Sequence, residues 1–96
     1  MQLLGLHHIT AIAADPKRNL DFYTRVLGLR FVKKSVNQDD PGTYHLYYGD
    51  NLGSPGTALT FFPWIGMRRG RPGQGQAYAT GFSVAASAIE FWRERL

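Results

Sequence analysis

Three histidines are the only neutral nitrogen ligands that this sequence can offer a metal ion, and no cysteine is present to supply a thiolate. His7 and His8 are consecutive, within a stretch whose side chains alternate in character. Successive side chains of a β-strand point to opposite faces of the sheet, so these two rings are not expected to hold one ion together. We therefore expect no more than one of them to be a ligand.

The same alternation places His8 and Thr10 on one face of the predicted strand. A threonine hydroxyl two residues from a histidine can hydrogen-bond a ligand or a substrate. Two interpretations stay open for His8 from the residues alone: a metal ligand, or a structural histidine whose nitrogens are satisfied in the core. His45, between Tyr44 and Leu46, is interpreted as a member of an aromatic cluster whose ring N–H can serve a pocket.

The carboxylates do not complete a metal site. A mononuclear non-haem iron site uses two histidines and one carboxylate, with open positions for substrate and oxygen. Asp15 is placed to cap a helix, and Asp39 and Asp40 belong to a turn. We therefore expect this chain to supply only part of such a ligand set.

The elements that must position these residues begin with a strand over residues 6–13. Asp15 and Pro16 then predict the N-cap and first residue of a helix, which Gly28 ends. Three more strands are predicted, over residues 29–37, 43–49 and 57–62. The predicted fold is α+β, in the order strand, helix, strand, strand, strand.

After the fourth strand the pattern restarts. Residues 77–84 predict a strand, and residues 87–96 predict a helix capped by Ser87 with Glu90 three positions on. This pair matches the opening of the chain in kind, so we interpret it as an internal repeat. The predicted domains are a first βαβββ module over 1–65, a Gly/Arg-rich linker over 66–76, and the first strand and helix of an incomplete second module over 77–96.

A lone strand and helix would leave a sheet edge unpaired and an apolar helix face uncovered. The incomplete second module therefore predicts one of two situations: the chain is a portion of a longer repeat protein, or a second chain completes it. A swapped homodimer is the expected form of the second situation.

Composition excludes several classes of function. The chain is 44% hydrophobic and 14% aromatic, which is typical of one small folded domain. Its net charge of +4 comes mostly from Arg68, Arg69 and Arg71, which lie in one glycine-rich loop and not along a strand face, so nucleic acid is not an expected partner. No apolar run is long enough to span a membrane and no signal peptide is recognisable, so a cytoplasmic location is expected. Phosphate-binding and serine-nucleophile motifs are absent.

Several segments resemble a known family. They are Leu6-His7-His8-Ile9-Thr10, Asn19-Leu20-Asp21-Phe22-Tyr23, Leu27-Gly28-Leu29-Arg30-Phe31-Val32, Tyr44-His45-Leu46-Tyr47-Tyr48-Gly49-Asp50, Gly53-Ser54-Pro55-Gly56-Thr57 and Thr60-Phe61-Phe62-Pro63. The sequence is similar to the vicinal oxygen chelate superfamily, which includes glyoxalases, bleomycin-resistance proteins and extradiol dioxygenases. Within it, the chain resembles the amino-terminal module of ring-cleaving dioxygenases that act on hydroquinones. The resemblance covers essentially the whole chain.

The resemblance implies that His8 is a metal ligand and that His7 and Thr10 contact the substrate or support the ligand, with His45 as a weaker candidate for the same role. The implied cofactor is Fe(II) or Mn(II), which binds a dihydroxy aromatic and O2 at adjacent positions. The family's other His and its Glu come from a later module. Where some members end the fourth strand with a Glu ligand, this chain has Thr60-Phe61-Phe62. The isolated chain is therefore expected to lack dioxygenase turnover.

Three alternatives stay open. The first is a metal-free module that binds small aromatics, as bleomycin-resistance proteins do, which the tyrosine-rich third strand suits. The second is a glyoxalase-like metalloprotein completed by dimerisation. The third is a remnant that only assembles with other modules. Stoichiometric metal in the purified protein favours an enzyme, tight aromatic binding in chelator favours the binding module, and a stable oligomer without ligand favours a part that only assembles.

Overall fold

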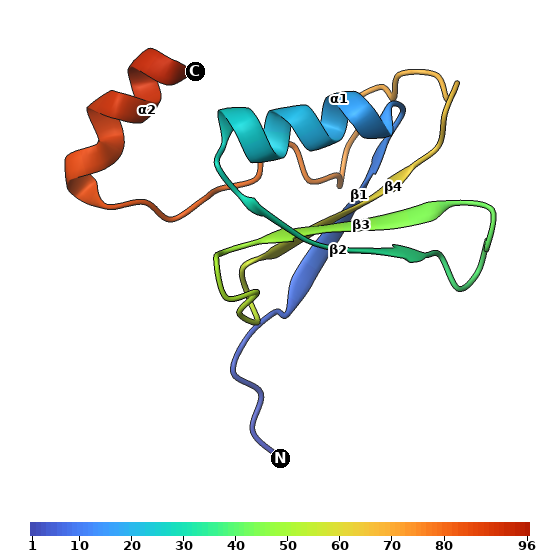
Figure 1. Cartoon of the computed structure of the whole chain (residues 1–96), viewed down its shortest axis with the longest axis horizontal. Helices are drawn as coiled ribbons and strands as arrows, with labels where there is room; N and C mark the ends of the chain where they lie inside the picture. The colour runs from blue at the N-terminus through green and yellow to red at the C-terminus, as the bar shows by residue number, and fades with distance from the viewer.

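The computed structural model describes residues 1–96 and contains one mixed four-stranded sheet and two helices (Figure 1). The strands are β1 (His8–Ala13), β2 (Arg30–Val36), β3 (Tyr44–Gly49) and β4 (Ala58–Pro63). Their order across the sheet is β1-β4-β3-β2, with β1 parallel to β4 and the other neighbours antiparallel. The predicted α+β fold and its element order are confirmed.

Helix α1 (Pro16–Asp21) begins where the sequence predicted. The Asp15 carboxylate accepts hydrogen bonds from the backbone N–H groups of Lys17 and Arg18, at 2.9 and 3.1 Å. The helix continues as a π-helical turn over Phe22–Val26. Gly28 then adopts a φ of +72°, a left-handed conformation that glycine tolerates without strain, and the chain turns into β2.

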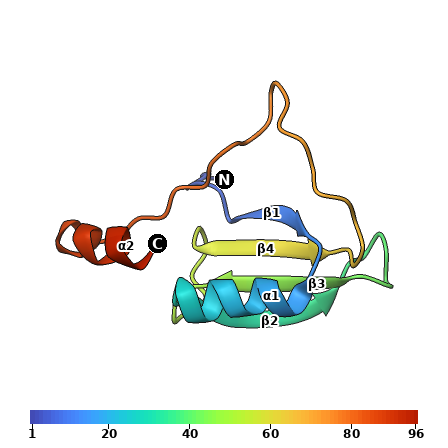
Figure 2. The ribbon, with the colours of Figure 1, turned by 90° about the horizontal axis from the view of Figure 1, so that it is seen from above.

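The core lies between the sheet and α1, which covers one face of the sheet (Figure 2). It is built from alternate residues of the two central strands: Leu46 and Tyr48 of β3, and Leu59 and Phe61 of β4. Ala13, Tyr23 and Leu29 pack against this cluster. Because side chains alternate along a strand, the residues between these four must face the other way. The sheet therefore has one apolar face under α1 and one open face.

A buried hydrogen bond joins α1 to the sheet. Tyr48 is completely buried, and its hydroxyl donates to Oδ1 of Asn19 at 2.7 Å. Burial, together with the neighbouring Tyr23, raises the pKa of Tyr48 to about 12. The Tyr48 hydroxyl therefore stays a neutral donor throughout the physiological pH range, and the helix is held to the sheet by a bond that water does not reach.

Tyr48→Phe removes this donor and leaves the Asn19 side-chain oxygen unpaired. An unsatisfied buried acceptor costs about 1–3 kcal/mol, so we expect the free energy of unfolding, measured by urea denaturation, to fall by about that amount. Tyr44→Phe is the matched control: Tyr44 is half exposed, its hydroxyl has no partner within the chain, and the change should stay within about 0.5 kcal/mol. Equal midpoints for the two variants would contradict a structural role for this bond.

The strand predicted over residues 77–84 does not form in this chain. The segment is extended but carries no ladder hydrogen bonds, because no neighbouring strand lies beside it. The prediction that Ser87 caps the last helix is also wrong. Ser87 lies inside a 3₁₀ turn (Ala86–Ala88) that precedes helix α2 (Ile89–Arg95), and no side chain caps either element. Glu90, the expected capping partner, instead forms an ion pair with Arg93 at 2.9 Å.

Helix α2 lies away from the sheet, and its last residue holds it to the end of the first helical segment (Figure 1). The Arg95 guanidinium donates to the backbone carbonyls of Val26 and Arg25, each at 2.7 Å. Carbonyls at the end of a helix lack intrahelical partners and attract positive charge, so Arg95 stabilises that end. Neither helix of this structure has the length and apolar character needed to cross a membrane.

Candidate functional site on the open face of the sheet

Four polar side chains form one row across the open face, one from each strand. Thr10 of β1 stands opposite Thr60 of β4, Thr60 opposite Tyr47 of β3, and Tyr47 opposite Lys33 of β2. These positions alternate with the core residues, so the row faces away from α1. The next row along the same face contains Ile12, Phe62, His45 and Ser35. The open face is therefore a surface of hydroxyls, aromatic rings, one imidazole and one ammonium group.

A chain of three hydrogen bonds runs through these two rows. The Thr10 hydroxyl lies 2.6 Å from the hydroxyl of Thr60, which lies 2.9 Å from Nε2 of His45. Nδ1 of His45 lies 2.9 Å from the hydroxyl of Tyr47. Thr60, in the middle, is completely buried. The chain thus connects three strands and orients each of its side chains.

His45 lies among aromatic rings, as the sequence predicted. Its ring centroid is 4.2 Å from that of Tyr47 and 4.2 Å from that of Phe62. Burial lowers the pKa of His45, and the positive charges of His8 and Lys33 lower it further. The imidazole is therefore neutral at pH 7, with one N–H donor and one acceptor nitrogen.

His8 is the first residue of β1 and His7 precedes the strand. The expectation that their rings point to opposite faces is wrong, because that rule holds only within the pleated strand. Their Nδ1 atoms lie 2.9 Å apart, so one ring donates to the other. Both side chains are exposed, which excludes the alternative of a buried structural histidine for His8 in this chain.

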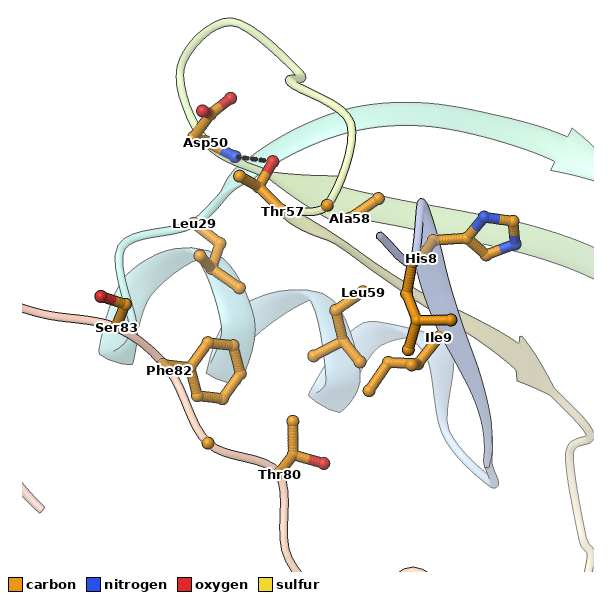
Figure 3. Close-up of a pocket in the computed structure, with 13 residues that line it drawn as sticks. His8, Ile9, Leu29, Asp50, Thr57, Ala58, Leu59, Thr80, Phe82 and Ser83 are labelled. Carbon is orange, nitrogen blue, oxygen red and sulfur yellow. Dashed lines mark hydrogen bonds between the residues drawn. The ribbon is translucent and has the colours of Figure 1, made fainter. Parts of the chain in front are cut away.

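The ring of His8 belongs to the open face. It lies 6.3 Å, centroid to centroid, from the ring of Tyr47. On the other side of β1, a cavity of about 410 Å³ lies between the sheet and the extended segment around Phe82. Figure 3 shows the His8 ring projecting away from the apolar side chains of Ile9, Leu59 and Phe82 in this cavity. The His8 imidazole therefore lies on the polar face and does not point into the apolar cavity.

The metal-ligating potential of the chain rests on His8. Its Nε2 makes no hydrogen bond within the chain, since only Nδ1 is engaged, with His7. Residues 1–96 bring together no group of three His, Asp or Glu side chains that could hold an ion. The donors present therefore fit one position of a metal site and not a complete set.

Sequence analysis brought His8, Thr10 and His45 into view, but it did not single out Thr60 or Lys33. Both lie on strands with the expected alternation, and that signal indicates which residues share a face. It does not indicate which residues of different strands stand opposite one another, because pairing depends on register. The row across the sheet is therefore visible only in the folded chain.

Residues 5–96 match the model of the Glyoxalase/Bleomycin resistance protein/Dioxygenase superfamily. The chain belongs to this family. The fold, the open sheet face and the first-strand histidines described above are thus those of a family member, and the resemblance drawn from the sequence motifs is confirmed.

Individual relatives are similar along the whole chain. The chain is 58% identical over 96 residues to "Putative ring-cleaving dioxygenase MhqE" of Bacillus subtilis (strain 168), covering 100% of this chain and 32% of that protein. It is 37% identical over 97 residues to the "Chlorohydroquinone/hydroquinone 1,2-dioxygenase" of Sphingobium indicum, covering 96% of this chain and 29% of that protein. The crystal structure of a "putative dioxygenase" from Bacillus subtilis superposes with a TM-score of 0.90 at 56% identity, covering 96% of this chain and 30% of the other.

The chain spans about a third of the length of the curated relatives it matches. The matched part is their amino-terminal part.

His45 should titrate below its ordinary pKa of 6.5, in NMR spectra of the imidazole nitrogens followed against pH. Lys33→Met removes one of the charges that lower the pKa, and should raise it toward 6.5. Lys34→Met is the control, since the Lys34 ammonium lies on the other face, 4.6 Å from the ring centroid of Tyr44. An unchanged pKa in Lys33→Met would contradict the assigned cause.

The lowered pKa of His45 also predicts how the stability of the protein changes with pH. Below pH 6.5 the unfolded chain binds a proton at His45 more readily than the folded chain does. The free energy of unfolding should therefore fall as the pH drops from 6.5 toward the pKa of the folded protein. His45→Gln should weaken this dependence.

Proposed function

We propose that this chain is the amino-terminal part of a metal-dependent ring-cleaving dioxygenase that acts on dihydroxy aromatics, and that its open sheet face forms one wall of the substrate site. The observation that carries the proposal is the placement of His8, whose free Nε2 borders a face of ordered hydroxyls and aromatic rings. The name of the Sphingobium relative supports hydroquinones as the substrate class.

His8 is the proposed metal ligand, through Nε2. A ligating histidine is commonly held in orientation by a hydrogen bond to its other nitrogen, and here Nδ1 of His8 is paired with His7. Fe(II) or Mn(II), when bound, would acidify a substrate hydroxyl and hold O2 beside it. The remaining donors are proposed to lie outside residues 1–96, in keeping with the chain's share of its relatives' length.

The other residues of the open face bind and orient the substrate. The Thr10 hydroxyl lies two residues from His8 on the same face, within reach of an oxygen substituent next to the metal position. The rings of Tyr47 and Phe62 offer apolar surface against which an aromatic substrate can pack. The Lys33 ammonium, 5.1 Å from the centroid of the Tyr47 ring, adds positive charge that favours an ionised phenol.

A metal-free aromatic-binding module is the second candidate, and the cluster of rings at His45, Tyr47 and Phe62 favours it. The two candidates differ in what they need. A binding module would still bind hydroquinone in the presence of chelator, as measured by calorimetry. A part of a dioxygenase site would lose most of its affinity for hydroquinone without the metal.

The role of His8 can be tested in a chimera in which this chain replaces the amino-terminal part of the Sphingobium relative. We expect His8→Ala to reduce bound iron or manganese at least about tenfold, measured by elemental analysis, with parallel loss of hydroquinone-dependent oxygen uptake. The control is Ile9→Ala, because that side chain points to the other face of β1. Retention of stoichiometric metal in the folded His8→Ala chimera would contradict the proposal.

The isolated chain should have no turnover, because it supplies one ligand position. After anaerobic reconstitution with Fe(II), hydroquinone should cause no more oxygen uptake than free Fe(II) does. Robust uptake that His8→Ala abolishes would show that the chain completes its own site. Light scattering on the same sample distinguishes completion by a homodimer from activity of a monomer.

A further inference from the structure

The hydrogen-bond chain from Tyr47 to Thr10 has a restricted set of proton arrangements. Each hydroxyl carries one hydrogen, and a neutral imidazole carries one N–H. A hydroxyl oxygen can accept two hydrogen bonds, so Thr60 could accept from both His45 and Thr10. Thr60 is completely buried and has no other side-chain partner, however, so that arrangement would leave its own hydrogen unpaired in the interior. When every bond is made and the Thr60 hydrogen is paired, all three bonds run in the same direction. The distances of 2.6, 2.9 and 2.9 Å require all three to be made.

The two directions present different groups to the open face. In the first, Tyr47 donates to Nδ1 of His45, Nε2–H of His45 donates to Thr60, and Thr60 donates to Thr10. The hydrogen of Thr10 is then free to point toward the face. In the second, Thr10 donates its hydrogen to Thr60 and presents only a lone pair to the open face.

Charge and acidity favour the first direction. A phenol is a stronger acid than an aliphatic hydroxyl, so Tyr47 is the best donor in the chain and an imidazole nitrogen is its best acceptor. The ammonium of Lys33 lies 5.1 Å from the centroid of the Tyr47 ring. A positive charge near the phenol is more favourable when the phenol gives its hydrogen to a neighbour and keeps its oxygen lone pairs free, so it favours donation from Tyr47 to His45.

We propose that Tyr47, His45 and Thr60 are positioning residues that make Thr10 a hydrogen-bond donor toward the open face, and so select the ionised oxygen of a phenolic substrate bound beside His8. This assignment rests on the proposed function for the identity of the substrate. The direction of the hydrogen bonds does not depend on the proposed function, because residues of this protein alone set it.

A merely structural role for these bonds would be satisfied by either direction, and the tautomer of His45 tells the two apart. The first direction requires hydrogen on Nε2 and none on Nδ1. The second requires the reverse. Two-bond nitrogen–proton correlation spectra of the ¹⁵N-labelled 96-residue chain at pH 8, without metal or substrate, report this tautomer directly.

We expect the Nε2–H tautomer in the unmodified chain and in Thr60→Ser, which keeps the hydroxyl. Thr60→Val removes the acceptor of Nε2–H and should shift His45 toward the Nδ1–H tautomer, with Tyr47 as its acceptor. Tyr47→Phe removes the donor to Nδ1 and should give a mixture of tautomers. The backbone amide spectrum of each variant reports whether it is folded, and Tyr47→Phe remains informative if Thr60→Val does not fold.

An Nδ1–H tautomer in the unmodified chain would overturn the proposal, as would the same tautomer in all three variants. Because the spectra are recorded without metal, these outcomes are separate from failure of the proposed dioxygenase function, which the metal content of the His8→Ala chimera reports. If the His8→Ala chimera retains its metal while the tautomers are those expected, the proposed direction of the hydrogen bonds is supported. Only the proposed identity of the substrate is then contradicted.

Discussion

The pairing of β1 with β4 is the constraint on which the site depends. The first and last strands of the sheet-forming part meet in parallel register, which sets Thr10 opposite Thr60 and His8 opposite Ala58. Through the antiparallel pairing of β4 with β3, Thr60 also meets Tyr47. A shift of β1 by one residue would move His8 and Thr10 to the face under α1 and break the hydrogen-bond chain at its first bond.

The two faces of the sheet have different roles: one packs against α1 and the other carries the candidate site. The α1 face is filled by aromatic and aliphatic side chains, and its one buried polar contact, between Tyr48 and Asn19, is fully paired. This rigid face holds the strands in register. The polar groups of the open face can therefore stay ordered without a covering helix, because their positions are fixed by the backbone beneath and by bonds among themselves.

Local signals predicted the elements well, and they failed where long-range contacts decide. Asp15 and Gly28 mark the helix because capping and left-handed turns depend on neighbouring residues. Residues 77–84 have the composition of a strand, but a strand also needs a partner, and none lies beside them here. The relation between His7 and His8 depended on where β1 starts: the strand begins at His8, two residues later than predicted, so His7 lies outside it and its ring contacts that of His8.

The sequence by itself determined the family, the α+β fold, the first helix and which residues of each strand share a face, because these follow from motifs, caps and alternation. Only the tertiary structure decided that Thr60, His45 and Tyr47 form one hydrogen-bonded chain ending at Thr10. These residues come from three strands separated by loops whose lengths leave the pairing open. Register is a property of the whole sheet, fixed when the apolar face packs under α1, and it cannot be obtained from any single strand.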